Sequence, residues 1–164
     1  MKTALPPIYV VIIKITMGRD DLMAKRIKNY NVKNTYLLRL EKGDDLLKTL
    51  TEVVKENNIK LATISGLGAV SRVIFGYYDQ QDWEYNFIEK KGQFEILSLN
   101  GNVSIKDGEP MVHAHIMLAD DSGDAFGGHL AEGTEVFASE IEIQELDKAD
   151  KVRKYDEDTG LTLW

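Results

Sequence analysis

Apolar positions recur along the chain with two different spacings, and each spacing predicts one type of secondary structure. Between residues 44 and 57 they fall at i, i+1, i+4, i+7 and i+8, which is the repeat of an amphipathic helix. This apolar stripe consists of Leu46, Leu47, Leu50, Val53 and Val54. Asp44 is placed to cap the helix, because its carboxylate can accept a hydrogen bond from an amide of the first turn.

Shorter apolar runs, separated by turn residues, predict strands over the rest of the chain. The expected strands span residues 35–40, 61–65, 70–78, 85–90, 94–104, 111–118 and 134–146. The glycine-containing stretch 66–69 is expected to turn the chain, and Gly92 is expected to separate two strands. One principal helix among many strands with short turns predicts an α+β fold with a mainly antiparallel β-sheet.

This pattern divides the chain into three parts. They are an N-terminal extension or arm at residues 1–33, a domain at 34–146 and a C-terminal tail at 147–164. A length of 164 residues suits a single domain. The tail is charged but ends in Leu-Thr-Leu-Trp, and we expect this apolar tip to dock onto the domain or onto a neighbouring subunit.

The first part contains an apolar run at residues 4–13. It is too short for a membrane span, which takes about 20 residues, and no small-residue cleavage site of a signal peptide follows it. The run is either an edge strand or an upstream extension, with translation beginning at Met17 or Met23. The extension is the preferred interpretation, because the globular pattern starts near Asn34.

Composition narrows the chemistry. The chain has no cysteine, which excludes disulfides, thiolate zinc sites and cysteine nucleophiles. The absence fits a reducing compartment, and we expect a cytoplasmic protein without a membrane association. A formal net charge of −7 disfavours nonspecific binding to nucleic acid. The candidate DNA contacts are the basic residues Lys25, Arg26, Lys28 and Lys33, for which a solvated arm is the alternative interpretation.

All three histidines lie within a stretch of seventeen residues. His113 and His115 are two apart on an expected strand and so share one of its faces. A turn at 119–124 can return the chain as a hairpin and bring His129 beside them. Three imidazoles with an open fourth position are the pattern of an exchangeable or catalytic metal site, with Zn²⁺ as the expected metal. The alternatives are histidines that serve only in packing, and a His129 that serves a neighbouring subunit's site.

Other candidate residues flank the histidines. Glu140 and Glu142 share a face of the strand at 134–146, and a glutamate beside a metal can act as general base on bound water. A solvent-facing strand is the alternative for both. An aromatic run can line a pocket or stack bases, although core packing and subunit contact are commoner uses. It consists of Tyr77, Tyr78, Trp83 and Tyr85.

Several short motifs occur in order along the domain. They are Leu-Arg-Leu-Glu-Lys-Gly-Asp-Asp-Leu at 38–46, Ile-Ser-Gly-Leu-Gly-Ala at 64–69, Gly-Tyr-Tyr-Asp at 76–79, Phe-Glu-Ile-Leu-Ser-Leu-Asn-Gly at 94–101, His-Ala-His-Ile at 113–116 and Gly-Gly-His-Leu at 127–130. Together they resemble prokaryotic members of the plants-and-prokaryotes conserved (PPC) domain family. The resemblance covers roughly residues 36–146, and the tail at 155–161 also resembles these members.

The resemblance implies a compact α+β fold, a homotrimer and a metal site on His113, His115 and His129. Plant relatives carry an AT-hook, and this chain has no Arg-Gly-Arg-Pro sequence and has Gln93 in place of an arginine. Prokaryotic members are often described as DNA-binding. The leading interpretation is therefore a trimeric zinc-binding PPC protein that acts as a binding or regulatory module, with DNA as a candidate partner. The alternative is a zinc-dependent hydrolase with Glu140 or Glu142 as base.

Overall fold

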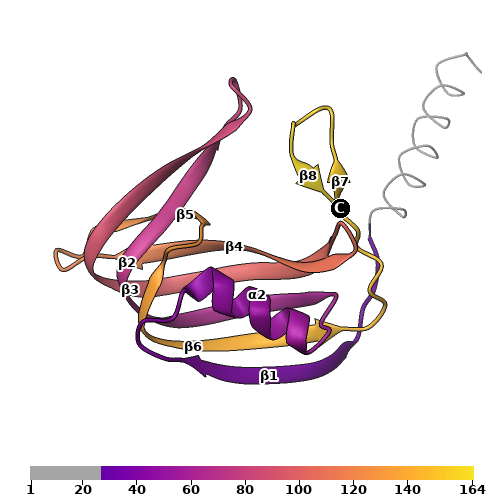
Figure 1. Ribbon diagram of the computed structural model, residues 1–164, viewed down its shortest axis with the longest axis horizontal. Coiled ribbons are helices and arrows are strands. Elements are labelled where there is room, and N and C mark those ends of the chain that lie inside the picture. Colours follow the sequence, from indigo (N-terminus) through magenta and orange to yellow (C-terminus); the bar gives the residue numbers. More distant parts are fainter. Residues whose placement is uncertain (1–26) are drawn as a thin grey trace, which may run out of the picture. The chain divides into compact units, whose positions relative to one another are not determined.

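A curved six-stranded sheet carries one helix on one of its faces (Figure 1). The computed structural model describes residues 27–164, within which Asn31–Trp164 form one compact unit. The sheet contains β1 (Val32–Leu40), β2 (Ala62–Asp79), β3 (Glu84–Lys106), β4 (Glu109–Ala119), β5 (Ala125–Leu130) and β6 (Glu135–Leu146). The remaining elements are α2 (Leu46–Glu56), β7 (Lys154–Tyr155) and β8 (Thr162–Leu163).

The expected antiparallel sheet is confirmed, and its strands run in the order β1-β6-β2-β3-β4-β5. Over residues 27–164 the helical part is short, because α2 has only 11 residues. No helix in this range is long and apolar enough to cross a membrane. The apolar run at 4–13, Met17, Met23, Lys25 and Arg26 lie outside the described residues.

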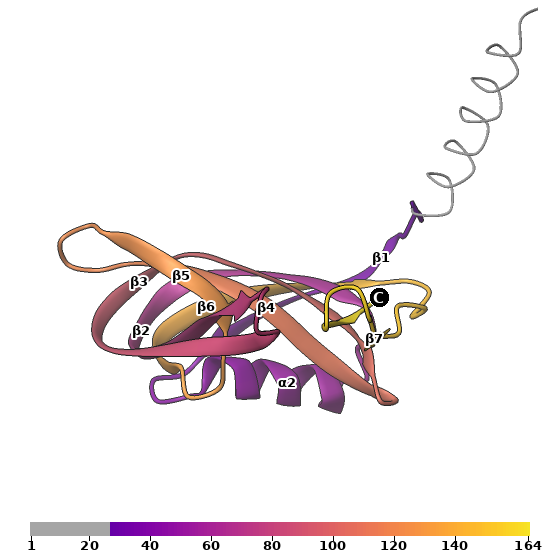
Figure 2. The same cartoon turned by 90° about the horizontal axis from the view of Figure 1, so that it is seen from above.

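Helix α2 forms where the apolar stripe predicts it. Leu46, Leu50 and Val54 are completely buried against the sheet, and the helix covers a single face (Figure 2). The predicted cap is wrong by one residue. Asp45 caps the helix, since its carboxylate accepts a hydrogen bond from the Lys48 amide at 3.0 Å. Asp44 instead accepts from the Glu41 amide at 2.8 Å and stabilises the preceding turn.

Two of the predicted breaks are not breaks. β2 runs unbroken through the glycine-containing stretch 66–69, and β3 runs unbroken through Gly92. At Gly68 the backbone has φ +142°, and a Cβ there would meet the Ala138 carbonyl oxygen and lie 2.6 Å from the Ser139 Cα. Glycine thus lets β2 approach β6 and change register without ending. The predicted turn at this stretch is therefore wrong.

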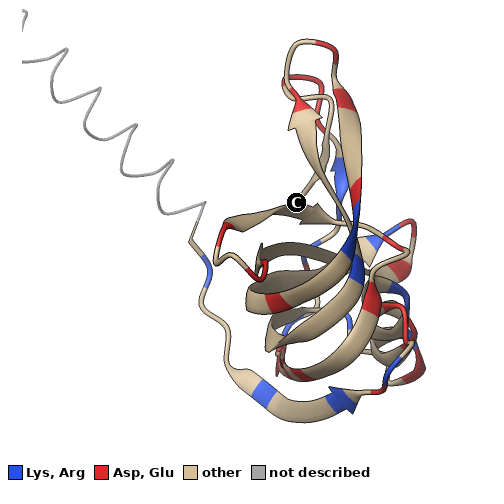
Figure 3. Ribbon diagram, turned by 90° about the vertical axis from the view of Figure 1, so that its left-hand side faces the viewer, with Lys and Arg blue, Asp and Glu red and all other residues tan. Residues whose placement is uncertain are grey.

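Because β2 and β3 are long, their distal halves extend beyond the other strands as a hairpin, residues 72–91, called the distal hairpin below (Figure 1). Its tip carries the acidic residues Asp79, Asp82 and Glu84, and is red in Figure 3. At the base of this hairpin β2 also pairs with β5, through Phe75 opposite Leu130 and Gly76 opposite His129. This second pairing curls the end of the sheet and places β5 between β4 and β2.

The C-terminal tail docks onto the sheet, as predicted, but its apolar tip is not the main contact. Arg153 donates its backbone amide to the Ile105 carbonyl at 2.7 Å, and the Ile105 amide bonds the Lys151 carbonyl at 2.9 Å. The Tyr78 hydroxyl of the distal hairpin donates to the Thr159 carbonyl at 2.9 Å. Trp164 is 53% exposed, so backbone pairing and polar contacts hold the tail.

Glu145 forms a polar cluster with β1. Glu145 is 6% exposed. Its carboxylate accepts hydrogen bonds from Lys33 (2.7 Å), Asn34 (2.7 Å) and Tyr36 (3.0 Å). Burial by itself raises the pKa of Glu145, but these three donors outweigh burial and lower it below its ordinary value. The same contact raises the pKa of Lys33. Lys33 therefore pairs within the fold and secures the edge strand β1.

We predict that Glu145→Gln destabilises the protein at pH 7 by about 1–2 kcal/mol, because charge-assisted hydrogen bonds to a buried carboxylate are lost. The lowered folded-state pKa means that this stabilisation is present above the ordinary value of 4.5 and is lost as the pH falls through the folded pKa. Urea denaturation of both proteins at pH 7 and at pH 3 measures the difference. The exposed Glu132→Gln is the control. An equal difference at both pH values would contradict the assignment.

Candidate metal centre

Strand β4 presents two histidines on its outer face. Residues Val112, Ala114, Ile116 and Leu118 are buried on the core side. The intervening positions, His113 and His115, point the other way, as the two-residue alternation of a strand requires. They lie opposite Asn102 and Asn100 of β3, respectively. The predicted same-face pair is therefore confirmed.

The third histidine arrives by a hairpin. The chain turns at Asp120–Asp124 and returns as β5, whose register places His129 directly opposite His115. Gly127 makes this return close. A Cβ at that position would meet the Ile116 carbonyl oxygen and lie 2.9 Å from the Met117 Cα. The predicted hairpin, with His129 beside the β4 pair, is confirmed.

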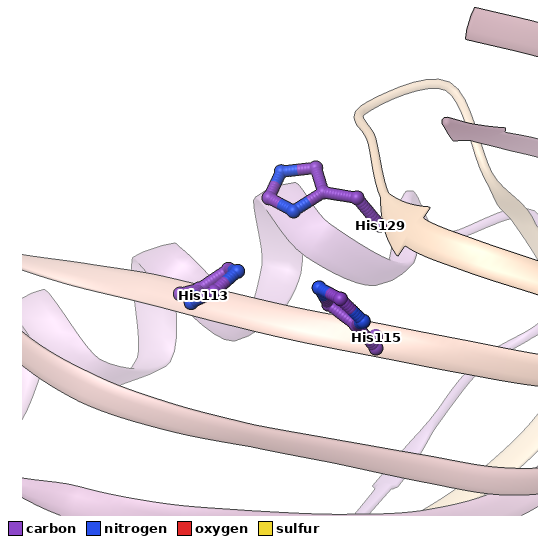
Figure 4. A group of neighbouring side chains, drawn as sticks. All are labelled: His113, His115 and His129. Carbon is purple, nitrogen blue, oxygen red and sulfur yellow. The ribbon is translucent and has the colours of Figure 1, made fainter. Parts of the chain in front are cut away.

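The three imidazoles converge on one space (Figure 4). Their ring centroids lie 5.3 Å apart for His113–His115, 5.0 Å for His113–His129 and 5.6 Å for His115–His129. One nitrogen of each ring lies within 4.8 Å of the other two. Around a tetrahedral zinc with Zn–N bonds of about 2.0–2.1 Å the nitrogens would be about 3.3 Å apart. Small side-chain rotations are enough to close that difference.

The surroundings of His113 and His129 favour their uncharged forms. The pKa of His113 is lowered to about 4, mainly by burial and then by the nearby His129, Arg153 and His115 in that order. Burial, then His115 and Arg153, also lowers the pKa of His129. Neutral imidazole is the form that binds metal.

A buried nitrogen atom of His129 also indicates a bound ligand. Its Nδ1 is buried and has no hydrogen-bond partner among the described residues. A buried polar atom without a partner is costly and calls for an explanation, such as an ion or a water molecule. The donor set of three imidazoles and this orphaned nitrogen both fit a bound metal ion.

Arg153 of the tail also lies beside the candidate metal centre, and no sequence pattern predicts this. One of its Nη atoms lies 3.5 Å from the His113 Nδ1. The same side chain donates to the Ser104 hydroxyl at 2.7 Å, to the Asn102 amide oxygen at 2.9 Å and to the Thr162 carbonyl at 3.0 Å. In the sequence Arg153 is one charge among many in a charged tail, so no spacing signal marks it.

Tyr85 is the member of the aromatic run that touches the histidines. Its ring centroid lies 4.6 Å from that of His129, and on its other side it stacks on Phe87 at 5.8 Å. Tyr77 and Trp83 are about half exposed on the distal hairpin, at 56% and 49%. Tyr85 thus forms one wall of the candidate metal centre.

Glu140 and Glu142 lie away from the histidines. The sheet order puts β2 and β3 between β6 and β4. Glu142 shares a row with His115, through Ser65 and Asn100, and three strand spacings correspond to about 14 Å. Both glutamates line a separate groove of about 590 Å³ with residues of β1 and β2. Within one chain the structure does not bring either carboxylate to the candidate metal centre.

The predicted nucleic-acid contacts are only partly within the described residues. Lys28 is exposed, and Lys33 forms the ion pair with Glu145. The structure brings none of the described basic residues to the histidine group, except Arg153, which was not among the predicted contacts.

Comparison with known proteins identifies the family. The Plants and Prokaryotes Conserved (PCC) domain family matches residues 27–147, which include the whole sheet and all three histidines. The chain therefore belongs to this family, which is the PPC family that the motifs resemble.

Three solved structures share the fold. A plant- and prokaryote-conserved protein from Pyrococcus horikoshii is 42% identical, with a TM-score of 0.80 over 84% of this chain and 95% of that chain. A metal-containing protein from Archaeoglobus fulgidus is 43% identical, with a TM-score of 0.79 over 84% and 97%. A protein from Bacteroides thetaiotaomicron that is proposed to bind DNA is 25% identical, with a TM-score of 0.75 over 82% and 94%.

A curated relative is much longer than this chain. The bifunctional protein GlmU from a Synechococcus strain is 31% identical over 105 residues, which cover 63% of this chain. The chain spans only 16% of the length of that relative.

Proposed function

We propose that this chain is a trimeric zinc-binding protein of the cytoplasm that acts as a binding or regulatory module. The observation that carries the proposal is the convergence of His113, His115 and His129, with one nitrogen of each ring within 4.8 Å of the others. The function resides in the domain at residues 34–146. The tail at 147–164 contributes Arg153 beside the histidines.

Zinc suits this donor set. Imidazole nitrogens bind Zn²⁺, Cu²⁺, Fe²⁺ and Ni²⁺, and zinc alone has no redox chemistry to control and accepts tetrahedral sites readily. Three histidines leave one position open, which a water molecule or a ligand would fill. A zinc ion bound there would act as a Lewis acid toward that fourth ligand. The similarity to a metal-containing protein from Archaeoglobus fulgidus supports the same proposal.

A trimer would explain the outer face of the sheet. Leu37 and Leu67 are 79% and 58% exposed. The strand registers put them on the same face as His115, opposite the face that α2 covers. Apolar side chains gathered on an exposed face mark interaction surfaces. We propose that other copies of the chain cover the part of this face that β1, β6 and β2 form, which leaves the groove beside His115 open.

DNA is the candidate partner for a second function. The observation that favours it is the similarity to the protein from Bacteroides thetaiotaomicron that is proposed to bind DNA. The net charge of −7 limits such binding to a local basic segment. Lys25, Arg26 and Lys28 form that segment, because Lys33 is engaged with Glu145. Three copies of a weak arm on a trimer would add their contacts.

The arrangement of the carboxylates disfavours a zinc-dependent hydrolase. Such an enzyme needs a general base within reach of the metal-bound water. Glu140 and Glu142 lie two intervening strands away from β4, and no carboxylate among residues 27–164 belongs to the histidine group.

Metal analysis tests the main proposal. Purified protein should contain about one zinc per chain after equilibration with Zn²⁺ and desalting, and His113→Ala/His115→Ala should contain almost none, because one imidazole cannot hold the ion. Light scattering of the same wild-type sample should give three times the chain mass of 18.5 kDa.

The matched control is Asn100→Ala, which alters the neighbouring strand on the same face and keeps all three imidazoles. Equal zinc in the wild type and in the double variant would refute the metal site. A monomer mass would refute the trimer but leave the metal site intact.

For the second function, Lys25→Gln/Arg26→Gln/Lys28→Gln should weaken binding to a fluorescent DNA duplex and reduce the slope of log affinity against log salt, because fewer counterions are released. Fluorescence anisotropy between 50 and about 200 mM salt measures both. Lys48→Gln/Lys55→Gln/Lys60→Gln, which removes three exposed lysines elsewhere in the chain, serves as the charge-matched control. Binding that the triple variant leaves unchanged, or a wild type that does not bind, would exclude the basic segment as a DNA contact.

A further inference from the structure

Arg153 is a buried cation without a counterion. It is 8% exposed. No Asp or Glu carboxylate of residues 27–164 lies within ion-pair distance of it. Buried charges are ordinarily paired, because removing a lone charge from water costs several kcal/mol. The fold must therefore retain Arg153 against a cost that nothing in the described residues offsets with charge.

Polar contacts to neighbouring residues hold the Arg153 guanidinium in place. Its Nε donates to Ser104 and one Nη to Thr162, and the other Nη donates to Asn102 and lies 3.5 Å from the His113 Nδ1. All of these partners are neutral. They come from β3, β4 and β8, so three separate elements aim one positive charge at the histidine group.

A metal ion would make the local charge excess larger. A divalent ion on three neutral imidazoles has charge +2, and Arg153 raises the total to about +3. The histidine group itself contains no carboxylate. An arrangement of this kind is electrostatically complete only with an anion at the open position of the metal, and it binds that anion more tightly than the metal would alone.

We propose that the metal-loaded histidine group takes a small organic carboxylate as its remaining ligand, and that Arg153 supplies the matching charge. This inference rests on the proposed function, because it requires a metal on the three histidines. It goes further by naming the chemical class of the ligand and the residue that selects it.

Arg153 has one free N–H to offer to such a ligand. A guanidinium has five N–H groups, and the contacts above use four of them. The single N–H left excludes the bidentate fork with which arginine binds both carboxylates and phosphates. Arg153 therefore contributes its charge and at most one hydrogen bond, which suits one carboxylate oxygen.

The surface beside His115 gives such a ligand access and an apolar wall. His115 is exposed and lines a groove of about 490 Å³. Met117 and Phe126 line the same groove, together with the polar Ser98 and Asn100. Apolar walls with a few polar groups are typical of sites for small organic molecules. An organic acid could place its hydrocarbon part there, which an inorganic anion could not.

The test uses full-length protein loaded with Co²⁺, whose visible absorption reports changes in its ligands. Titration with sodium acetate at constant ionic strength should change the wild-type spectrum to saturation. Arg153→Gln, which keeps polar contacts but no charge, should retain Co²⁺ and bind acetate at least tenfold more weakly. Arg153→Lys should recover part of the affinity. Lys60→Gln, an exposed cation remote in sequence, is the control and should behave as the wild type.

The outcomes separate the two levels of the argument. Wild-type protein that takes up no Co²⁺ contradicts the proposed function and this inference with it. A cobalt-loaded wild type that ignores acetate, or that responds to phosphate more strongly than to acetate, overturns the carboxylate ligand alone. Equal acetate affinity in the wild type, Arg153→Gln and Arg153→Lys overturns the role of Arg153. Circular dichroism establishes that each variant is folded.

Discussion

The site depends on the register between β4 and β5. His115 lies directly opposite His129, and this pairing places three imidazoles from two strands around one space. A shift by one residue would turn His129 to the other face of the sheet, because side chains alternate along a strand. The pairing of β5 with β2, through Phe75 and Gly76, fixes this register from the other side. Backbone hydrogen bonds of the curled sheet therefore hold the three histidines in position.

The C-terminal tail acts on the same site from a distance in sequence. Forty residues separate Arg153 from His113. The tail pairs with β3 through backbone hydrogen bonds at Ile105, and the Arg153 guanidinium donates to the Thr162 carbonyl of β8. The positive charge of Arg153 lies beside the imidazoles. It lowers the pKa of both His113 and His129, as a smaller contribution beside burial. The tail is thus part of the candidate metal centre.

Local patterns predicted much of this arrangement. The stripe of α2, the alternation of β4 and the hairpin turn after it are short-range features, and each was confirmed. The two wrongly predicted strand breaks share one cause. Gly68 and Gly92 suggest chain breaks, yet both lie inside long strands, because the pairing of β2 with β3 and β6 continues past them. Arg153 was missed because its partners lie some 40 or more residues earlier.

X-ray absorption at the zinc edge of the zinc-loaded protein tests the central claim most directly. The account predicts a first coordination shell of three imidazole nitrogens at about 2.0–2.1 Å with one oxygen ligand, and the multiple-scattering features that imidazole rings give. A shell dominated by oxygen, or one with fewer than three imidazoles, would show that the convergence of His113, His115 and His129 is not a zinc site.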